Sequence, residues 1–174
     1  MKFIINIFGP STAGKSTIAE LLQEQIDQLY TVDFDVIKRQ ISGYHWKRDS
    51  GTAQQITLDT LASVSKTDLT ILALLPPPKS KETFDRTEGI AKASLYTLIN
   101  IEITAPDEVL VKRYRDRLRQ VQESGTKWKF KTLDEFTAKL QEGYYRPDNT
   151  VTFDSSVMSP DLIFSKIKEL TAKL

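Results

Sequence analysis

The sequence contains no cysteine and only one histidine, His45. The absence of cysteine excludes disulfide bonds, thiolate metal sites and cysteine nucleophiles. A chain without disulfides suits a reducing compartment, and we expect this protein in the cytoplasm. A lone histidine is more often structural than catalytic, so the chemistry has to be sought in other side chains.

Long hydrophobic runs and a strong charge of either sign are missing too. No apolar stretch approaches the roughly 20 residues that cross a bilayer, and the N-terminus does not resemble a signal peptide. The 24 basic and 23 acidic side chains give a formal net charge of +1. Such a balance does not favour nucleic acid or an anionic membrane as a partner. We therefore expect a small-molecule or nucleotide-type substrate, with nucleic acid as the less favoured partner. The length of the chain predicts one domain, residues 1–174.

Residues 9–16 read G-P-S-T-A-G-K-S and match the phosphate-binding P-loop pattern G-x-x-x-x-G-K-[ST]. The context of the motif agrees with the match. An apolar, β-rich run at residues 2–8 precedes it, as expected for a buried parallel strand. A helical stripe follows it, formed by Ile18, Ala19, Leu21, Leu22, Ile26 and Leu29. The sequence therefore predicts a strand, a phosphate loop and a helix in direct succession.

This loop predicts a nucleoside triphosphate and Mg²⁺ as ligands. Its glycines let backbone N–H groups turn toward phosphate oxygens, and the helix adds its positive dipole end. Lys15 is predicted to reach the β- and γ-phosphates, and the Ser16 hydroxyl to bind Mg²⁺. The absence of an N-K-x-D guanine signature makes ATP the expected nucleotide. The predicted nucleotide-binding residues are Gly9, Ser11, Thr12, Ala13, Gly14, Lys15, Ser16 and Thr17.

Strands and helices alternate along the rest of the chain. Further strands are predicted at residues 30–32, 69–75, 95–104 and 150–153, and helices at 36–42, 52–66, 80–94, 106–123, 133–141 and from 159 onward. This alternation predicts an α/β fold, with a parallel sheet covered by helices on both faces. Sites in such sheets lie at the carboxyl ends of the strands, where the P-loop and the Asp33–Asp35 turn both fall.

Asp33 and Asp35 directly follow the second predicted strand. A carboxylate there can accept the proton of an attacking hydroxyl, hold Mg²⁺ through water, or cap the next helix. The third predicted strand ends at Pro76–Pro78 without the Asp that many P-loop proteins use for Mg²⁺. Its absence disfavours a motor ATPase or a switch GTPase.

Three segments resemble the small P-loop kinases: residues 9–17, V-D-F-D-V-I-K-R at 32–39 and V-L-V-K-R-Y-R-D-R at 109–117. They are most similar to the branch that holds polynucleotide 5′-kinase domains, chloramphenicol phosphotransferase, zeta-toxin-type sugar-nucleotide kinases, and adenylylsulfate and gluconate kinases. The resemblance implies a five-stranded parallel sheet with a mobile LID, here at about residues 113–131. It also implies that Asp35 is the general base and that Lys38 or Arg39 grips the acceptor. Family members usually carry Arg at the first of these two positions, and Lys cannot reproduce its bidentate geometry.

Arg113 and Arg117 are four residues apart and share a helix face. The resemblance implies that they close over the triphosphate and stabilise the phosphoryl group in transfer, whereas the alternative is a solvated basic face. The basic and aromatic stretch at 127–131 could instead stack single-stranded nucleic acid. Arg86 is a candidate for the acceptor pocket or an ordinary surface residue.

Together these features predict an ATP- and Mg²⁺-dependent kinase that acts on a hydroxyl of a small molecule, a nucleoside-type compound or a nucleic-acid 5′-end. The predicted catalytic residues are Lys15, Asp35, Arg113 and Arg117; the substrate-binding residues are Asp33, Lys38, Arg39 and Arg86; and Ser16 is the metal ligand. One alternative is a nucleoside monophosphate kinase, whose acceptor needs no base. The other is a non-catalytic module that binds or senses ATP.

Overall fold

In the computed structural model of the chain, residues 1–76, 80–124 and 132–172 are described. Five strands form one parallel sheet in the order β2-β3-β1-β4-β5. Their bounds are β1 (Phe3–Phe8), β2 (Tyr30–Asp33), β3 (Ile71–Leu75), β4 (Thr97–Thr104) and β5 (Thr150–Asp154). The prediction of an α/β fold with a five-stranded parallel sheet is confirmed.

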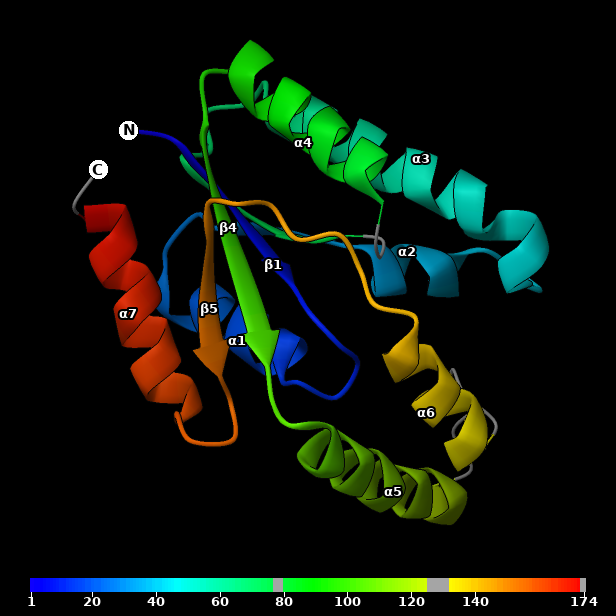
Figure 1. The fold of residues 1–174 in the computed structure, drawn as a ribbon. Helices are drawn as coiled ribbons and strands as arrows, with labels where there is room; N and C mark the ends of the chain where they lie inside the picture. Colours follow the sequence, from blue (N-terminus) through cyan, green and yellow to red (C-terminus); the bar gives the residue numbers. More distant parts are fainter. Residues whose placement is uncertain (77–79, 125–131, 173–174) are drawn as a thin grey trace.

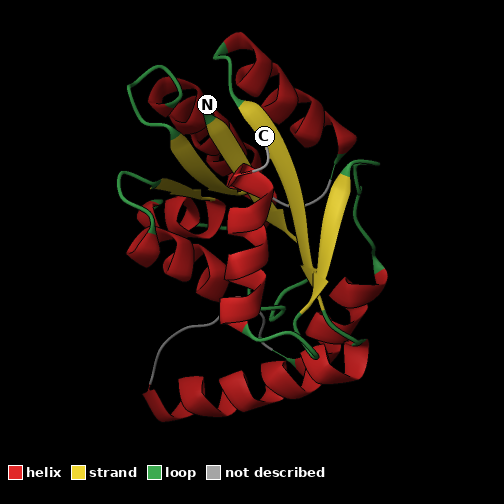
Figure 2. Ribbon diagram, turned by 90° about the vertical axis from the view of Figure 1, so that its left-hand side faces the viewer, coloured by secondary structure: helices red, strands yellow, loops and turns green. Residues whose placement is uncertain are grey.

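Helices cover both faces of this sheet (Figures 1 and 2). One face carries α1 (Lys15–Gln25) and α7 (Pro160–Ala172), and the other carries α3 (Trp46–Val64) and α4 (Lys81–Ala93). The short α2 (Phe34–Gln40) follows β2, while α5 (Asp107–Ser124) and α6 (Leu133–Gln141) lie beyond the carboxyl end of β4. Within the described residues, no helix is long and apolar enough to span a membrane.

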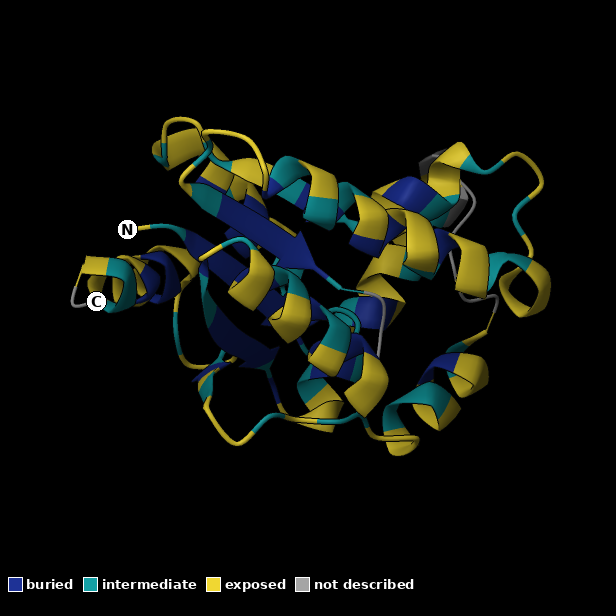
Figure 3. Cartoon of the chain, turned by 90° about the horizontal axis from the view of Figure 1, so that it is seen from above, coloured by how far each residue is buried: buried dark blue, intermediate teal, exposed yellow. Residues whose placement is uncertain are grey.

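The sheet separates two hydrophobic cores (Figure 3). Ile5 and Ile101 point toward α1 and α7, whereas Ile4 and Leu74 belong to the core beneath α3 and α4. Every residue of β1 is buried because helices cover both of its faces. This central strand therefore holds the start of the P-loop in a fixed position.

Two helices begin earlier than the sequence predicts. The helix α2 begins at Phe34 rather than Val36, because Asp33 supplies its N-cap. The helix α3 begins at Trp46 rather than at residue 52, and Asp49 Oδ2 accepts the N–H of His45 at 2.7 Å. Both predicted starts are wrong. The stretch 125–131, which contains the basic and aromatic residues and part of the predicted LID, lies outside the described residues.

Candidate nucleotide and acceptor site

The P-loop leaves β1 through a close backbone contact. A Cβ atom built on Gly9 would lie 2.1 Å from the carbonyl oxygen of Ile103 on β4, so no other residue fits there. The backbone of Gly9, Thr12 and Gly14 adopts positive φ angles of 131°, 66° and 97°. These turns carry the chain from the end of β1 to the first residue of α1 within a few residues.

The first turn of α1 suits an anion. Its N-cap residue, Gly14, makes no side-chain cap hydrogen bond, and the positive end of the helix dipole lies at this point. The Nζ atom of Lys15 donates to the carbonyl oxygen of Pro10 at 2.6 Å, so this side chain folds back along the loop. Ser16 and Thr17 are exposed at the same end. These features fit a triphosphate with its Mg²⁺ ion.

Arg113 forms hydrogen bonds both with the P-loop and with the turn that follows β5. Its Nη1 atom donates to the carbonyl oxygen of Thr12 at 3.4 Å and to Ser155 Oγ at 2.8 Å, and Nη2 donates to the carbonyl oxygen of Ser155 at 2.7 Å. The Thr12 hydroxyl also donates to the carbonyl oxygen of Leu110 on α5, at 3.0 Å. The N-terminal half of α5 therefore supports the outer side of the loop.

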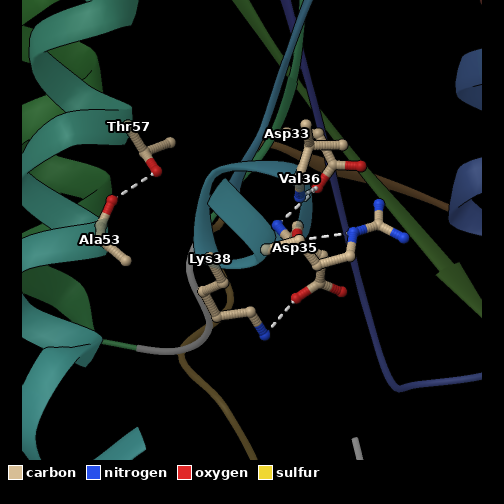
Figure 4. A network of polar contacts seen from close by, with 7 residues as sticks. Asp33, Asp35, Val36, Lys38, Ala53 and Thr57 are labelled. Carbon is tan, nitrogen blue, oxygen red and sulfur yellow. Dashed lines mark hydrogen bonds and ion pairs between the residues drawn. The ribbon is translucent and has the colours of Figure 1, made fainter. Parts of the chain in front are cut away.

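The two aspartates after β2 have different partners (Figure 4). The Oδ1 atom of Asp33 accepts the N–H groups of Asp35 at 2.6 Å and of Val36 at 3.4 Å, which makes Asp33 the cap of α2. Burial raises the pKa of the Asp33 carboxyl group, although these two hydrogen bonds oppose the shift. The capping role that the sequence allowed for one of the pair thus falls to Asp33.

Asp35 instead directs its carboxylate at Lys38, with Oδ1 2.5 Å from Nζ (Figure 4). The Asp35 side chain is 59% exposed, whereas that of Lys38 is only 12% exposed. The Lys38 ammonium group also lies 4.9 Å from the ring centroid of Phe34 and 5.8 Å from that of Tyr44. The neighbouring Arg39 donates Nε to the carbonyl oxygen of Asp35 at 3.2 Å. Asp35, Lys38 and Arg39 are therefore one cluster on α2.

Arg117 extends this cluster to α5. Its guanidinium group is partly enclosed by protein, and this desolvation lowers the pKa of Arg117, while the carboxylates of Glu20 on α1 and Asp35 on α2 oppose the shift. Arg117 is thus in the electrostatic field of Asp35, whereas Arg113 contacts the P-loop. The catalytic roles of both arginines stay predictions.

Arg86 joins the two helices that cover the second face of the sheet. Its Nη2 atom, on α4, donates to Gln55 Oε1 on α3 at 2.8 Å. Nearby, Gln54 Nε2 donates to Thr83 Oγ1 at 2.9 Å. The predicted contact of Arg86 with an acceptor stays a prediction. Among the described residues, no group of three or more His, Asp or Glu side chains could hold a metal ion.

Sequence reasoning missed a polar network around Glu102 on β4. Glu102 as a whole is 8% exposed, and its carboxylate accepts hydrogen bonds from Tyr144 Oη at 2.5 Å and from Thr152 Oγ1 at 2.8 Å. Arg146 Nε lies 3.1 Å from its Oε2 atom. The network attaches the segment between α6 and β5 to the sheet. Its sequence signal is the single carboxylate within the apolar run I-N-I-E-I.

No protein-family model matches this chain, and no curated protein matches it. Among solved structures it resembles a protein of Chloroflexus aurantiacus that carries a provisional kinase assignment, with 17% identity, a TM-score of 0.76 and coverage of 99% of this chain and 97% of that one. The tunicamycin resistance protein of Deinococcus radiodurans has 15% identity, a TM-score of 0.65 and coverage of 98% and 96%. The APS kinase of Mycobacterium tuberculosis, solved with AMPPNP and APS, has 17% identity, a TM-score of 0.63 and coverage of 98% of both chains.

These similarities extend over nearly the whole length of each chain. At such low identity they show the fold and not the substrate. The protein has the fold of P-loop kinases, and its P-loop lies at the carboxyl end of the parallel sheet, as in the general rule for α/β proteins.

Proposed function

We propose that this protein is an ATP- and Mg²⁺-dependent kinase that transfers the γ-phosphoryl group of ATP to a hydroxyl group. The observation that carries the proposal is the position of Asp35. It follows β2 at the same sheet edge as the P-loop, and its carboxylate is more than half exposed, while its neighbour Asp33 is used as a helix cap. A partly exposed carboxylate at the same sheet edge as a phosphate loop suits a general base for a hydroxyl acceptor.

In this proposal the residues from Gly9 to Thr17 bind the triphosphate, with Lys15 on the β- and γ-phosphates. The acceptor oxygen attacks the γ-phosphorus, a new P–O bond forms, and the bond to the bridging β–γ oxygen breaks, so that ADP leaves with the electron pair. The acceptor proton moves to the Asp35 carboxylate. Arg117 and Arg113 neutralise charge on the phosphoryl group. To reach it, Arg113 gives up its hydrogen bond from Nη1 to Ser155 Oγ.

Ser16 would hold Mg²⁺. When bound, the ion would neutralise part of the negative charge of the phosphates. Its hydroxyl stands at the exposed first turn of α1, next to the residues that suit phosphate. Asp33 contributes on the acceptor side by fixing the start of α2, on which Asp35, Lys38 and Arg39 are carried. Arg86 is proposed to border the acceptor pocket from α4.

The test is phosphoryl transfer to pooled acceptors. Purified protein is incubated with ATP and Mg²⁺ and with pools of nucleosides, nucleotides, 5′-hydroxyl oligonucleotides, sugars and hydroxylated antibiotics, and mass spectrometry detects the gain of one phosphate. Lys15→Met, which removes the P-loop ammonium group, is the control for contaminating kinases. A gain on a hydroxyl that is lost in Lys15→Met supports the proposal.

Two other results would overturn it. A gain restricted to the phosphate of nucleoside monophosphates would make the protein a nucleoside monophosphate kinase. ATP binding without a gain in any pool would favour the non-catalytic ATP-binding module.

A further inference from the structure

The basic side chains of α2, and those of Arg48 on α3 and Arg86 on α4, contact groups of the protein itself. Lys38 pairs with the Asp35 carboxylate, and Arg39 donates to its carbonyl oxygen. Arg48, which follows on α3, donates two hydrogen bonds to the Asp49 carboxylate and one to the carbonyl oxygen of Gly43. Arg86 donates to Gln55. This arrangement differs from a pocket in which cations converge on an acceptor phosphate.

The Lys38 side chain is only 12% exposed, and its surroundings compensate its charge. The ammonium group lies 4.9 Å from the ring centroid of Phe34 and 5.8 Å from that of Tyr44, and it pairs with Asp35 Oδ1. A lysine ammonium group acts as a compact point charge and cannot grip two anions with the fixed fork of an arginine. Moving it to an acceptor phosphate would separate it from Asp35 and remove it from both rings.

Resting on the kinase function proposed above, we infer that the acceptor is an uncharged hydroxyl compound, and that Lys38 positions Asp35 rather than binding an acceptor anion. The ion pair holds the Asp35 carboxylate in one orientation, from which it can accept the proton of the acceptor hydroxyl. An acceptor with a phosphate next to its hydroxyl would bring a second negative charge close to the Asp35 carboxylate. Lys38 would not neutralise that charge, because it already pairs with Asp35. Arg117 also lies in the field of Asp35, and the proposed mechanism uses it for the migrating phosphoryl group.

The first arm of the test compares acceptors that differ by one phosphate group. Each acceptor found in the pools is assayed beside its matched charged or uncharged form, such as a nucleoside beside its 3′-monophosphate or a sugar beside its 6-phosphate. The inference predicts that the uncharged form has a kcat/KM higher by at least about tenfold. A higher kcat/KM for the phosphorylated form would overturn the inference and leave the kinase function intact.

The second arm separates positioning from binding at Lys38. In Lys38→Met, loss of a positioning partner lowers kcat by about 10- to 100-fold with KM nearly unchanged, whereas loss of an anion contact raises KM with kcat unchanged. Lys38→Arg, which keeps the charge, is expected to recover most of kcat. Lys92→Met is the matched control, because Lys92 also pairs with a carboxylate, Glu88 Oε1 at 3.1 Å, on the surface of α4.

Folding of each variant is checked by circular dichroism. If Lys38→Met fails to fold, Lys38→Arg and the matched acceptors decide the question. A rise of KM alone in Lys38→Met, or in Lys38→Arg, would overturn the inference. Absence of transfer to every acceptor, charged and uncharged, would overturn the kinase function and the inference with it.

Discussion

Gly9 and Ile103 are in such close contact that a single methyl group cannot be placed between them, since a Cβ on Gly9 would lie 2.1 Å from the Ile103 carbonyl oxygen. We predict that Gly9→Ala displaces the P-loop from β4. The clash involves backbone rather than a flexible side chain, and the φ angle of 131° adds strain of about 1 to 3 kcal/mol. Chemical denaturation should show a loss of stability above about 3 kcal/mol, and calorimetry a loss of ATP binding.

Gly89→Ala is the control for this prediction. A Cβ at this position meets nothing within 4 Å, and Gly89 lies inside α4. Alanine there should raise stability by about 0.5 to 1 kcal/mol through its higher helix propensity. Equal stability of the Gly9→Ala and wild-type proteins would contradict the packing of the loop against β4.

The fold and the phosphate loop could be predicted because their signals are local. Alternating apolar strands and helices specify a parallel sheet, and Gly9 to Ser16 carry the loop geometry in one short segment. The start of α3 was missed because Gly51 lowers the helix propensity of its first turns, while the hydrogen bond between Asp49 and the N–H of His45 has no strong sequence signature.

The candidate site is less predictable because its contacts join distant segments. Periodicity places Arg113 and Arg117 on one face of α5, yet Arg113 contacts Ser155 and Arg117 lies in the field of Glu20 and Asp35. The partner of each arginine depends on how α5 packs over the P-loop, which helical spacing does not specify. Lys38 likewise has a sequence position that suits an acceptor, and its pairing with Asp35 emerges from the structure of α2.

The two aspartates after β2 are expected to respond differently to the same substitution. Asp35→Asn should lower kcat by about 10²- to 10⁴-fold with little change in ATP affinity, because it removes the proposed base. Asp33→Asn should retain most of kcat, because asparagine is as good an N-cap as aspartate. Steady-state kinetics with the identified acceptor measure both effects. Equal losses in the two variants would assign a direct role to Asp33.

Asp33 also gives a prediction about pH. Because burial raises the pKa of the Asp33 carboxyl in the folded state, ionisation of this group favours unfolding as the pH rises through that pKa. Asp33→Asn removes this effect and keeps the cap, so it should match or exceed the stability of the wild type at pH 7, with the difference shrinking below about pH 4. Asp33→Ala loses the cap as well, so it should be about 1 kcal/mol less stable than Asp33→Asn at both pH values. Urea denaturation at pH 7 and pH 4 decides between these outcomes.

Substitutions of Arg113 and of Arg117 should differ in their effects on stability and on kinetics. Arg113→Ala removes the hydrogen bonds to Thr12 and Ser155, so it should lower the melting temperature and weaken ATP binding. Arg117→Ala should leave the melting temperature nearly unchanged and lower kcat by about 10²- to 10³-fold, because it removes a cation near the reacting phosphoryl. Thermal melts and kinetics on both variants provide the test. A reversed pattern would show that Arg117 supports the fold and that Arg113 acts in the transfer step without supporting the P-loop.

The raised pKa of the Tyr144 hydroxyl predicts a loss of stability at alkaline pH. Burial, together with its hydrogen bond to Glu102, raises the pKa of the Tyr144 hydroxyl above its ordinary value. The hydrogen bond therefore stabilises the folded state fully below about pH 10, the ordinary tyrosine pKa, and this contribution is lost as the pH rises through the higher pKa of the folded state. Tyr144→Phe should cost about 1 to 2 kcal/mol at pH 8, and the gap from the wild type should narrow above about pH 10. Denaturation curves of both proteins from pH 8 to pH values above 10 measure the gap. Subtraction removes the contributions of the other tyrosines because both proteins contain them. A gap that stays constant across this range would show that Tyr144 ionises alike in the folded and unfolded states. The contacts of Glu102 with Thr152 and Arg146 would then be the ones that hold the segment after α6.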